Sequence, residues 1–185
     1  MARQIDEIDR INADLTGFIV LKSIEVDIPE DGALDLPNEI LGRLDLAVGS
    51  IHYALDLPLQ RQTERLLRAM DNRYFNIIAH PTGRLINRRR AYALDMERVM
   101  RGAVDRSCYI ELNSQPDRLD LTDVHCRMAK QLGVKVAIST DAHAPVEFDF
   151  MRFGVDQARR GWLEPEDVLN TRSLSGLRDL LRRHR

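Results

Sequence analysis

Short runs of apolar, often β-branched residues alternate along the chain with stretches in which apolar positions recur every three or four residues. The short runs predict strands, and the longer-period stretches predict amphipathic helices. The predicted strands are residues 18–28, 46–52, 75–80, 108–113 and 134–140. The predicted helices are residues 1–15, 59–70, 95–105, 122–132 and 146–160, and a short helix, a turn and a basic helix follow within residues 163–185.

This alternation is typical of an α/β fold, in which helices pack outside a parallel sheet. Asp120 or Thr122 suits the cap of the helix at 122–132, and Gly133 stands where a glycine would end it. No linker, repeat or low-complexity tract interrupts the pattern, so we expect a single domain over residues 1–185. Such strands form either a barrel or an open sheet, and five strands are too few to close a barrel.

Composition narrows the class of protein. With 44% hydrophobic and 30% charged residues, the 185-residue chain can bury a core. A net charge of −2 excludes an overall basic field, so any nucleic-acid contact is expected to be local. Cys108 and Cys126 lack metal-ligand spacing and are expected to be buried thiols. Because we find neither a signal peptide nor a membrane-spanning run, we expect a cytoplasmic protein without a membrane partner.

Polar residues with metal-binding side chains stand at or near the ends of the predicted strands. They are Glu25, His52, His80, Glu111 with Asn113, and Asp141 with His143. Because the carboxyl ends of the strands converge on one face of an α/β barrel, side chains far apart in the sequence can meet there. Imidazole and carboxylate groups suit zinc, manganese or iron. The pattern therefore predicts a divalent metal site.

Each of these residues alone has a simpler explanation. A histidine at a strand end is more often hydrogen-bonded within the fold than bound to metal, and Asp141 could instead cap a helix before residues 144–148. However, three of the five histidines fall at strand ends, and an acid inside the apolar strand around Glu25 is costly unless it is paired. The metal interpretation is therefore favoured, and we assign His125 and His184 no role in the site.

Several arginines follow these strand ends. Arg84 closes the segment HPTGR, and a guanidinium group there suits bidentate binding of phosphate. Arg118 is a second candidate for phosphate binding, and a surface salt bridge is the competing interpretation. For Arg88, Arg89 and Arg90 a solvated helix face is the favoured interpretation.

Six segments carry a resemblance to a known family: IEVDI, AVGSIH, IIAHPTGR, IELNSQPDRLDL, STDAH and FGVDQARRGWLEPEDVLN. In order and spacing they resemble the polymerase-and-histidinol-phosphatase (PHP) superfamily, specifically the carboxyl-terminal PHP domain of bacterial family X DNA polymerases. The resemblance covers nearly all of the chain. It implies a distorted (β/α)7 TIM-like barrel and a metal-dependent phosphoesterase with 3′–5′ exonuclease activity on DNA 3′ ends.

The resemblance also implies roles for individual residues. In this family the acid that matches Glu25 bridges two of up to three zinc or manganese ions, and the histidines that match His52 and His80 complete one of those sites. The counterparts of Asp141 and His143 belong to the second and third sites. We therefore assign Glu25, Asp141 and His143 to catalysis.

Glu111 and Asn113 match a family position beside the metal centre, where they contact the ligand residues or the substrate. The family also opens with an H-x-H strand and further histidines, whereas this chain begins in the helix just before the strand of Glu25. The resemblance thus implies an N-terminally incomplete barrel in which only the site of Glu25, His52 and His80 is complete.

An incomplete barrel leaves several functions open. A polymerase module or N-terminal segment acting in trans would restore the missing strands, and a homodimer would cover the strand edges that an incomplete barrel exposes. The alternatives to an active exonuclease are an inactive metal-binding remnant and a histidinol-phosphatase-like phosphomonoesterase.

Overall fold

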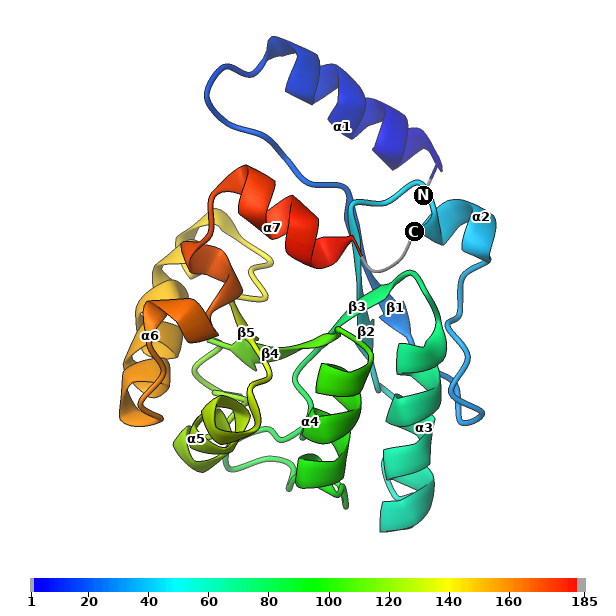
Figure 1. The fold of residues 1–185 in the computed structure, drawn as a ribbon, viewed down its shortest axis with the longest axis vertical. Coiled ribbons are helices and arrows are strands. Elements are labelled where there is room, and N and C mark those ends of the chain that lie inside the picture. Colours follow the sequence, from blue (N-terminus) through cyan, green and yellow to red (C-terminus); the bar gives the residue numbers. More distant parts are fainter. Residues whose placement is uncertain (1, 183–185) are drawn as a thin grey trace.

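Five parallel strands form the centre of the protein, in the order β1-β2-β3-β4-β5 (Figure 1). The computed structural model describes residues 2–182. The strands are β1 (Ser23–Asp27), β2 (Leu46–Ser50), β3 (Phe75–Ile78), β4 (Tyr109–Asn113) and β5 (Val136–Ser139). Each strand pairs in parallel with the next one along the chain, which confirms the predicted α/β fold.

Seven α-helices accompany the sheet within the described residues: α1 (Ala2–Asp14), α2 (Asn38–Leu41), α3 (Leu59–Asp71), α4 (Met96–Asp105), α5 (Asp123–Leu132), α6 (Met151–Arg160) and α7 (Leu174–Leu181). Three short 3₁₀ helices, η1 (Pro145–Phe150), η2 (Pro165–Asp167) and η3 (Leu169–Thr171), lie between α5 and α7. Helices α3 to α6 pack side by side in chain order. They cover one face of the sheet, and α7 lies on the other.

Alternating strand residues serve these two faces, because successive side chains of a strand point in opposite directions. Ile78, Ile110 and Leu112 belong to the main core beneath the helices. Ile77 and Tyr109 face the other way and pack with Leu169 and Leu181. The Tyr109 hydroxyl donates to the carbonyl of Leu180 at 2.7 Å, so α7 is fixed near the amino ends of the strands. The opposite, carboxyl ends of the strands remain available for a functional site.

Local signals placed the ends of several helices correctly. The Thr122 side chain caps α5 by accepting from the backbone N–H of His125 at 3.2 Å, and Gly133 ends that helix in the left-handed region at φ +80°. Asp120, the other predicted cap, is buried elsewhere. The predicted helix at 146–160 is divided into η1 and α6. His184 lies outside the described residues.

The structure corrects the prediction that Arg88, Arg89 and Arg90 lie on a helix. Residues 85–95 instead form a loop that is closed by an antiparallel bridge between Leu85 and Arg89. The reason is that no apolar residue recurs at helical spacing until Leu94 and Met96, where the next helix begins.

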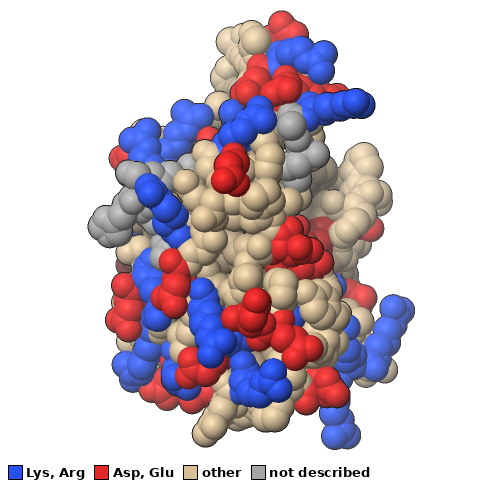
Figure 2. Space-filling model, turned by 90° about the vertical axis from the view of Figure 1, so that its right-hand side faces the viewer, with Lys and Arg blue, Asp and Glu red and all other residues tan. Residues whose placement is uncertain are grey.

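Strands β1 and β5 form the two edges of the sheet, and no pairing joins them among residues 2–182. The sequential order is that of a β/α barrel, but the barrel itself stays a prediction. None of the helices in this range has the length and apolarity needed to cross a bilayer. Cys108 and Cys126 are buried, as predicted, and form no disulfide within the described residues. Acidic and basic side chains are interspersed over the face seen in Figure 2.

Candidate metal centre

The carboxyl ends of β1, β2 and β3 bring together Glu25, His52 and His80. Glu25 lies within β1, and each histidine follows its own strand by two residues. Oε1 of Glu25 lies 3.2 Å from Nε2 of His52 and 3.0 Å from Nε2 of His80. One ligand atom from each of the three residues lies within 4.8 Å of the others. The trio predicted from strand ends is therefore assembled in the fold.

Asp27 is a member of this group that the sequence analysis missed. Its Oδ1 atom lies 2.7 Å from Nδ1 of His52, on the side of the ring opposite Glu25. Glu25 and Asp27 are two residues apart in β1, so both point to the same face of the sheet. This spacing, visible in the segment IEVDI, was the available signal. A carboxylate at Nδ1 fixes the orientation of the imidazole and leaves Nε2 to bind a metal ion.

The side chains of this group shift one another's pKa values. Hydrogen bonds from His52 and His80 hold the pKa of Glu25 far below its usual value. The bond to Glu25, together with the carboxylate of Asp27, raises the pKa of His52. The carboxylate of Glu25 is therefore ionised at neutral pH, the form in which it binds cations.

His80 is held more rigidly than His52, because its side chain is only 4% exposed whereas that of His52 is 47% exposed. Its backbone N–H donates to Oε2 of Glu111 at 2.5 Å. The turn that follows is fixed by Asp120, whose Oδ2 accepts from the backbone N–H and the hydroxyl of Thr82 at 2.9 and 2.8 Å. His80 itself has a φ of +24°, in the left-handed region. Strained backbone of this kind persists where the surroundings over-determine it, as they do here.

Glu111 and Asn113 form a buried link between His80 and the end of β5. Besides the His80 N–H, the Glu111 carboxylate accepts from the hydroxyl of Ser139 and from Nδ2 of Asn113. The same amide nitrogen donates to Oδ2 of Asp141 at 3.1 Å. Burial raises the pKa of Glu111. These residues lie beside the centre, as the resemblance implied, and their direct contact with substrate stays a prediction.

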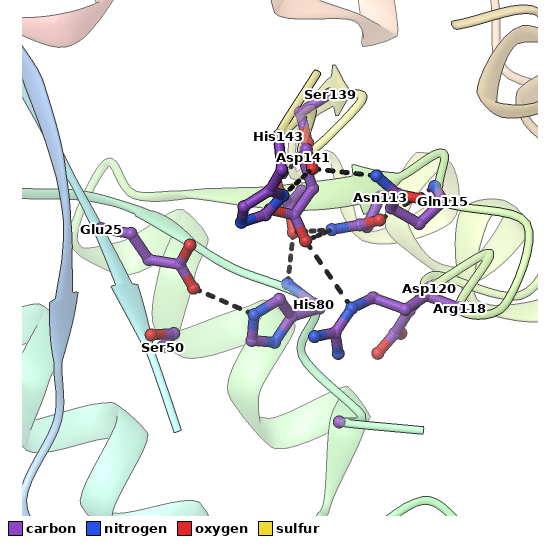
Figure 3. Close-up of polar contacts among 12 residues, drawn as sticks. Glu25, Ser50, His80, Asn113, Gln115, Arg118, Asp120, Ser139, Asp141 and His143 are labelled. Carbon is purple, nitrogen blue, oxygen red and sulfur yellow. Dashed lines mark hydrogen bonds and ion pairs between the residues drawn. The ribbon is translucent and has the colours of Figure 1, made fainter. Parts of the chain in front are cut away.

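Asp141 and His143 lie next to the trio but do not join it. In Figure 3, His80 stands between Glu25 on one side and the group of Asp141 and Arg118 on the other. Asp141 and His143 lie in a pocket of about 340 Å³, which is also lined by Leu85, Gln115, Asp117, Arg118 and Glu147. Asp141 has a φ of +50° and caps no helix, because η1 begins four residues later with Ala144 at its N-cap position. The helix-cap alternative is therefore wrong.

The two candidate phosphate-binding arginines differ in what they already bind. Arg84 donates through Nε to the carbonyl of Arg118 at 2.7 Å and through Nη2 to the carbonyl of Leu119. It thereby ties the loop after β3 to the loop after β4. Arg118 lies with Nε 3.6 Å from Oδ2 of Asp141, and its buried Nη1 has no hydrogen-bond partner among residues 2–182. Because Arg118, unlike Arg84, also lines the pocket of Asp141 and His143, it is better placed to bind a phosphate.

Known proteins are similar in sequence to this chain over most or all of its length. The chain is 41% identical over 184 residues, all of its length, to the DNA polymerase/3′–5′ exonuclease PolX of Bacillus subtilis. It is 32% identical over 169 residues to a probable phosphatase of Thermoanaerobacter sp. and 36% identical over 172 residues to one of Caldanaerobacter subterraneus, with 85% of the chain aligned in each case. The chain is homologous to these proteins.

The matches cover only part of each relative. The chain spans 32% of the length of PolX, 66% of the Thermoanaerobacter phosphatase and 63% of the Caldanaerobacter phosphatase. No protein-family model matches the chain. The comparisons thus relate this sequence to one segment of a polymerase/exonuclease and to the larger part of the two probable phosphatases.

Proposed function

We propose that the protein is a metal-dependent phosphoesterase of the PHP type, with Glu25, His52 and His80 as ligands of one divalent cation, zinc or manganese. The assembly of these three side chains at adjacent strand ends is the observation that carries the proposal. Zinc ligands placed tetrahedrally at their usual bond lengths lie about 3.3 Å apart. The Nε2–Oε1 distances of 3.0 and 3.2 Å suit such an arrangement. Three protein ligands also leave a coordination position open.

The chain's own residues supply the rest of the chemistry. A cation held by the trio would activate water as a nucleophile and offset negative charge on the phosphate oxygens. Asp27 orients His52, and Glu111 fixes the backbone of His80. Arg118, which lines the pocket of Asp141 and His143, would hold a non-reacting phosphate oxygen. Following the resemblance, we propose Asp141 and His143 as ligands of further metal ions in the adjoining pocket.

Two substrate classes are consistent with the homologous proteins. The name of PolX supports 3′–5′ exonuclease activity on DNA ends, and the names of the two phosphatases support a phosphomonoesterase. We favour the exonuclease, because PolX aligns with all of the chain and the phosphatases with 85% of it. A polymerase module or N-terminal segment in trans, and a homodimer, stay predictions.

Hydrolysis of bis(nitrophenyl) phosphate with added manganese tests the proposed function. We expect turnover that stops with a chelator, returns with metal, and is accompanied by at least one bound ion per chain in elemental analysis. Nitrophenyl phosphate and a single-stranded oligonucleotide, assayed in parallel, distinguish the monoesterase from the exonuclease. Turnover that persists unchanged in chelator would contradict metal dependence.

Asp27→Ala is predicted to weaken metal binding. Removal of a carboxylate that orients a ligand histidine typically lowers metal affinity about 10–100-fold. Zinc titration by calorimetry measures this change. Asp35→Ala is the matched control, since Asp35 is an exposed acid in the loop that follows the same strand. Equal affinities of Asp27→Ala and the wild type would remove Asp27 from the site.

A further inference from the structure

We propose that residues 84–91, here called the arginine loop, bind the phosphate backbone of a single-stranded polynucleotide next to the metal centre. This inference rests on the proposed function and extends it to the substrate lying outside the reacting phosphate. The loop begins four residues after His80 and contains Arg84, Arg88, Arg89 and Arg90.

The arginine loop has a fixed backbone. Leu85 and Arg89 exchange both backbone hydrogen bonds, each 2.8 Å long. The N–H of Ile86 donates to the carbonyl of Asp117 at 2.6 Å, which joins the loop to the segment after β4. Nε of Arg89 donates to the carbonyl of Gly83 at 2.8 Å. Binding would therefore cost little backbone entropy, because the loop is already ordered.

The arginine loop also carries several positive charges that no ion pair neutralises within the described residues. Residues 81–94 contain four arginines and no acid, in a chain whose net charge is −2. No ion pair links these four arginines to an acid within the described part of the chain. By contrast, Arg98, Arg101 and Arg106, the next arginines along the chain, each pair with an acid. Arg84 and Arg89 already donate to backbone carbonyls, so the exposed Arg88 and Arg90 are the members best able to bind an external anion.

The position of the arginine loop indicates which class of anion it binds. Its arginines line a hollow of about 560 Å³, and Leu85 also lines the pocket of Asp141 and His143. Arg88 and Arg90 are exposed. A polymer with an end in the metal centre and a phosphate at every repeat would meet both surfaces, which a small monoester would not. Guanidinium groups bind phosphate bidentately, and residues 84–91 contain no aromatic side chain to stack on bases. The expected binding is therefore independent of base sequence.

The test is equilibrium binding of a fluorescent oligothymidylate of about 12 nucleotides, measured by anisotropy in chelator over a range of salt concentrations. Each phosphate contact to a single strand contributes a salt slope of about 0.7, or about fivefold in affinity at 0.1 M salt. Arg88→Ala/Arg90→Ala should thus bind about 25-fold more weakly, with the slope reduced by about 1.4. Since both side chains are exposed, the thermal midpoint should stay close to that of the wild type.

Arg3→Ala/Arg10→Ala is the charge-matched control. Both residues are exposed on α1, which lies at the amino end of β1, away from the metal centre (Figure 1). Its affinity should match the wild type. Equal weakening of both double variants, no weakening of Arg88→Ala/Arg90→Ala, or equally tight binding of a polyglutamate peptide would overturn the proposal. Because binding is measured without metal or turnover, an absence of phosphoesterase activity would leave this result unchanged.

Discussion

Replacement of Arg65 by methionine is expected to lower the free energy of unfolding by about 3–5 kcal/mol. Arg65 lies on α3 and is 1% exposed. Its guanidinium group donates to the carbonyls of Ile28 and Pro29, which follow β1, and to those of Tyr53 and Ala54, which follow β2. Methionine fills similar space but removes the donor to the carbonyls of Ile28 and Tyr53, and each buried unsatisfied group costs about 1–3 kcal/mol. The carbonyls of Pro29 and Ala54 keep a second donor, from Gly32 and Gln62.

Urea unfolding followed by circular dichroism measures the change, with Arg68→Met as the matched control. Arg68 lies one turn along the same helix, is exposed and makes a single long bond, so its replacement should change stability by about 0.5 kcal/mol or less. A loss for Arg65→Met as small as that for the control would show that the two loops hold their positions without this residue.

The hydrogen bonds of Arg65 also position two strands that carry residues of the metal centre. The loops that Arg65 joins follow directly from Asp27 and His52, so the guanidinium group fixes the separation of two strands that carry members of the site. Even a folded Arg65→Met variant should therefore bind zinc more weakly than the wild type. Arg65 is thus a positioning residue that touches no ligand atom itself.

Features with a local signal could be predicted from the sequence. The strands follow from short apolar runs, and the ends of α5 follow from Thr122 and Gly133, because a cap depends on residues within one turn. Glu25, His52 and His80 were also predicted correctly as neighbours. Their meeting needs only the parallel order of strands, which places the carboxyl ends together.

Features that depend on contacts between distant segments could not be predicted. Arg65 lies within a polar helical sequence and resembles a surface residue, since its acceptors are backbone carbonyls that no sequence pattern marks. The bonds of Arg84 could not be predicted for the same reason. Its guanidinium group donates to backbone carbonyls of the loop after β4, and a phosphate would compete with these carbonyls for it. The four-residue helix α2 is too short to show a period.

Glu25→Gln is expected to remove the metal ion and the activity together. Glutamine has the shape of glutamate but lacks the charge that two imidazoles approach at 3.0 and 3.2 Å. Replacement of a residue that only orients a ligand typically lowers metal affinity about 10–100-fold, so loss of a direct ligand should cost at least about 100-fold. Elemental analysis and turnover of bis(nitrophenyl) phosphate measure the two effects on one preparation.

Glu30→Gln provides the matched control, because Glu30 lies on the loop after the same strand and pairs only loosely with Arg61, at 3.4 Å. It should keep both metal and activity. If Glu25→Gln retained its metal but lost turnover, Glu25 would act on the substrate and not as a ligand. If it retained both, the close approach of the two histidines would be an ion-pair cluster of the fold, and the catalytic centre would have to be sought around Asp141 and His143.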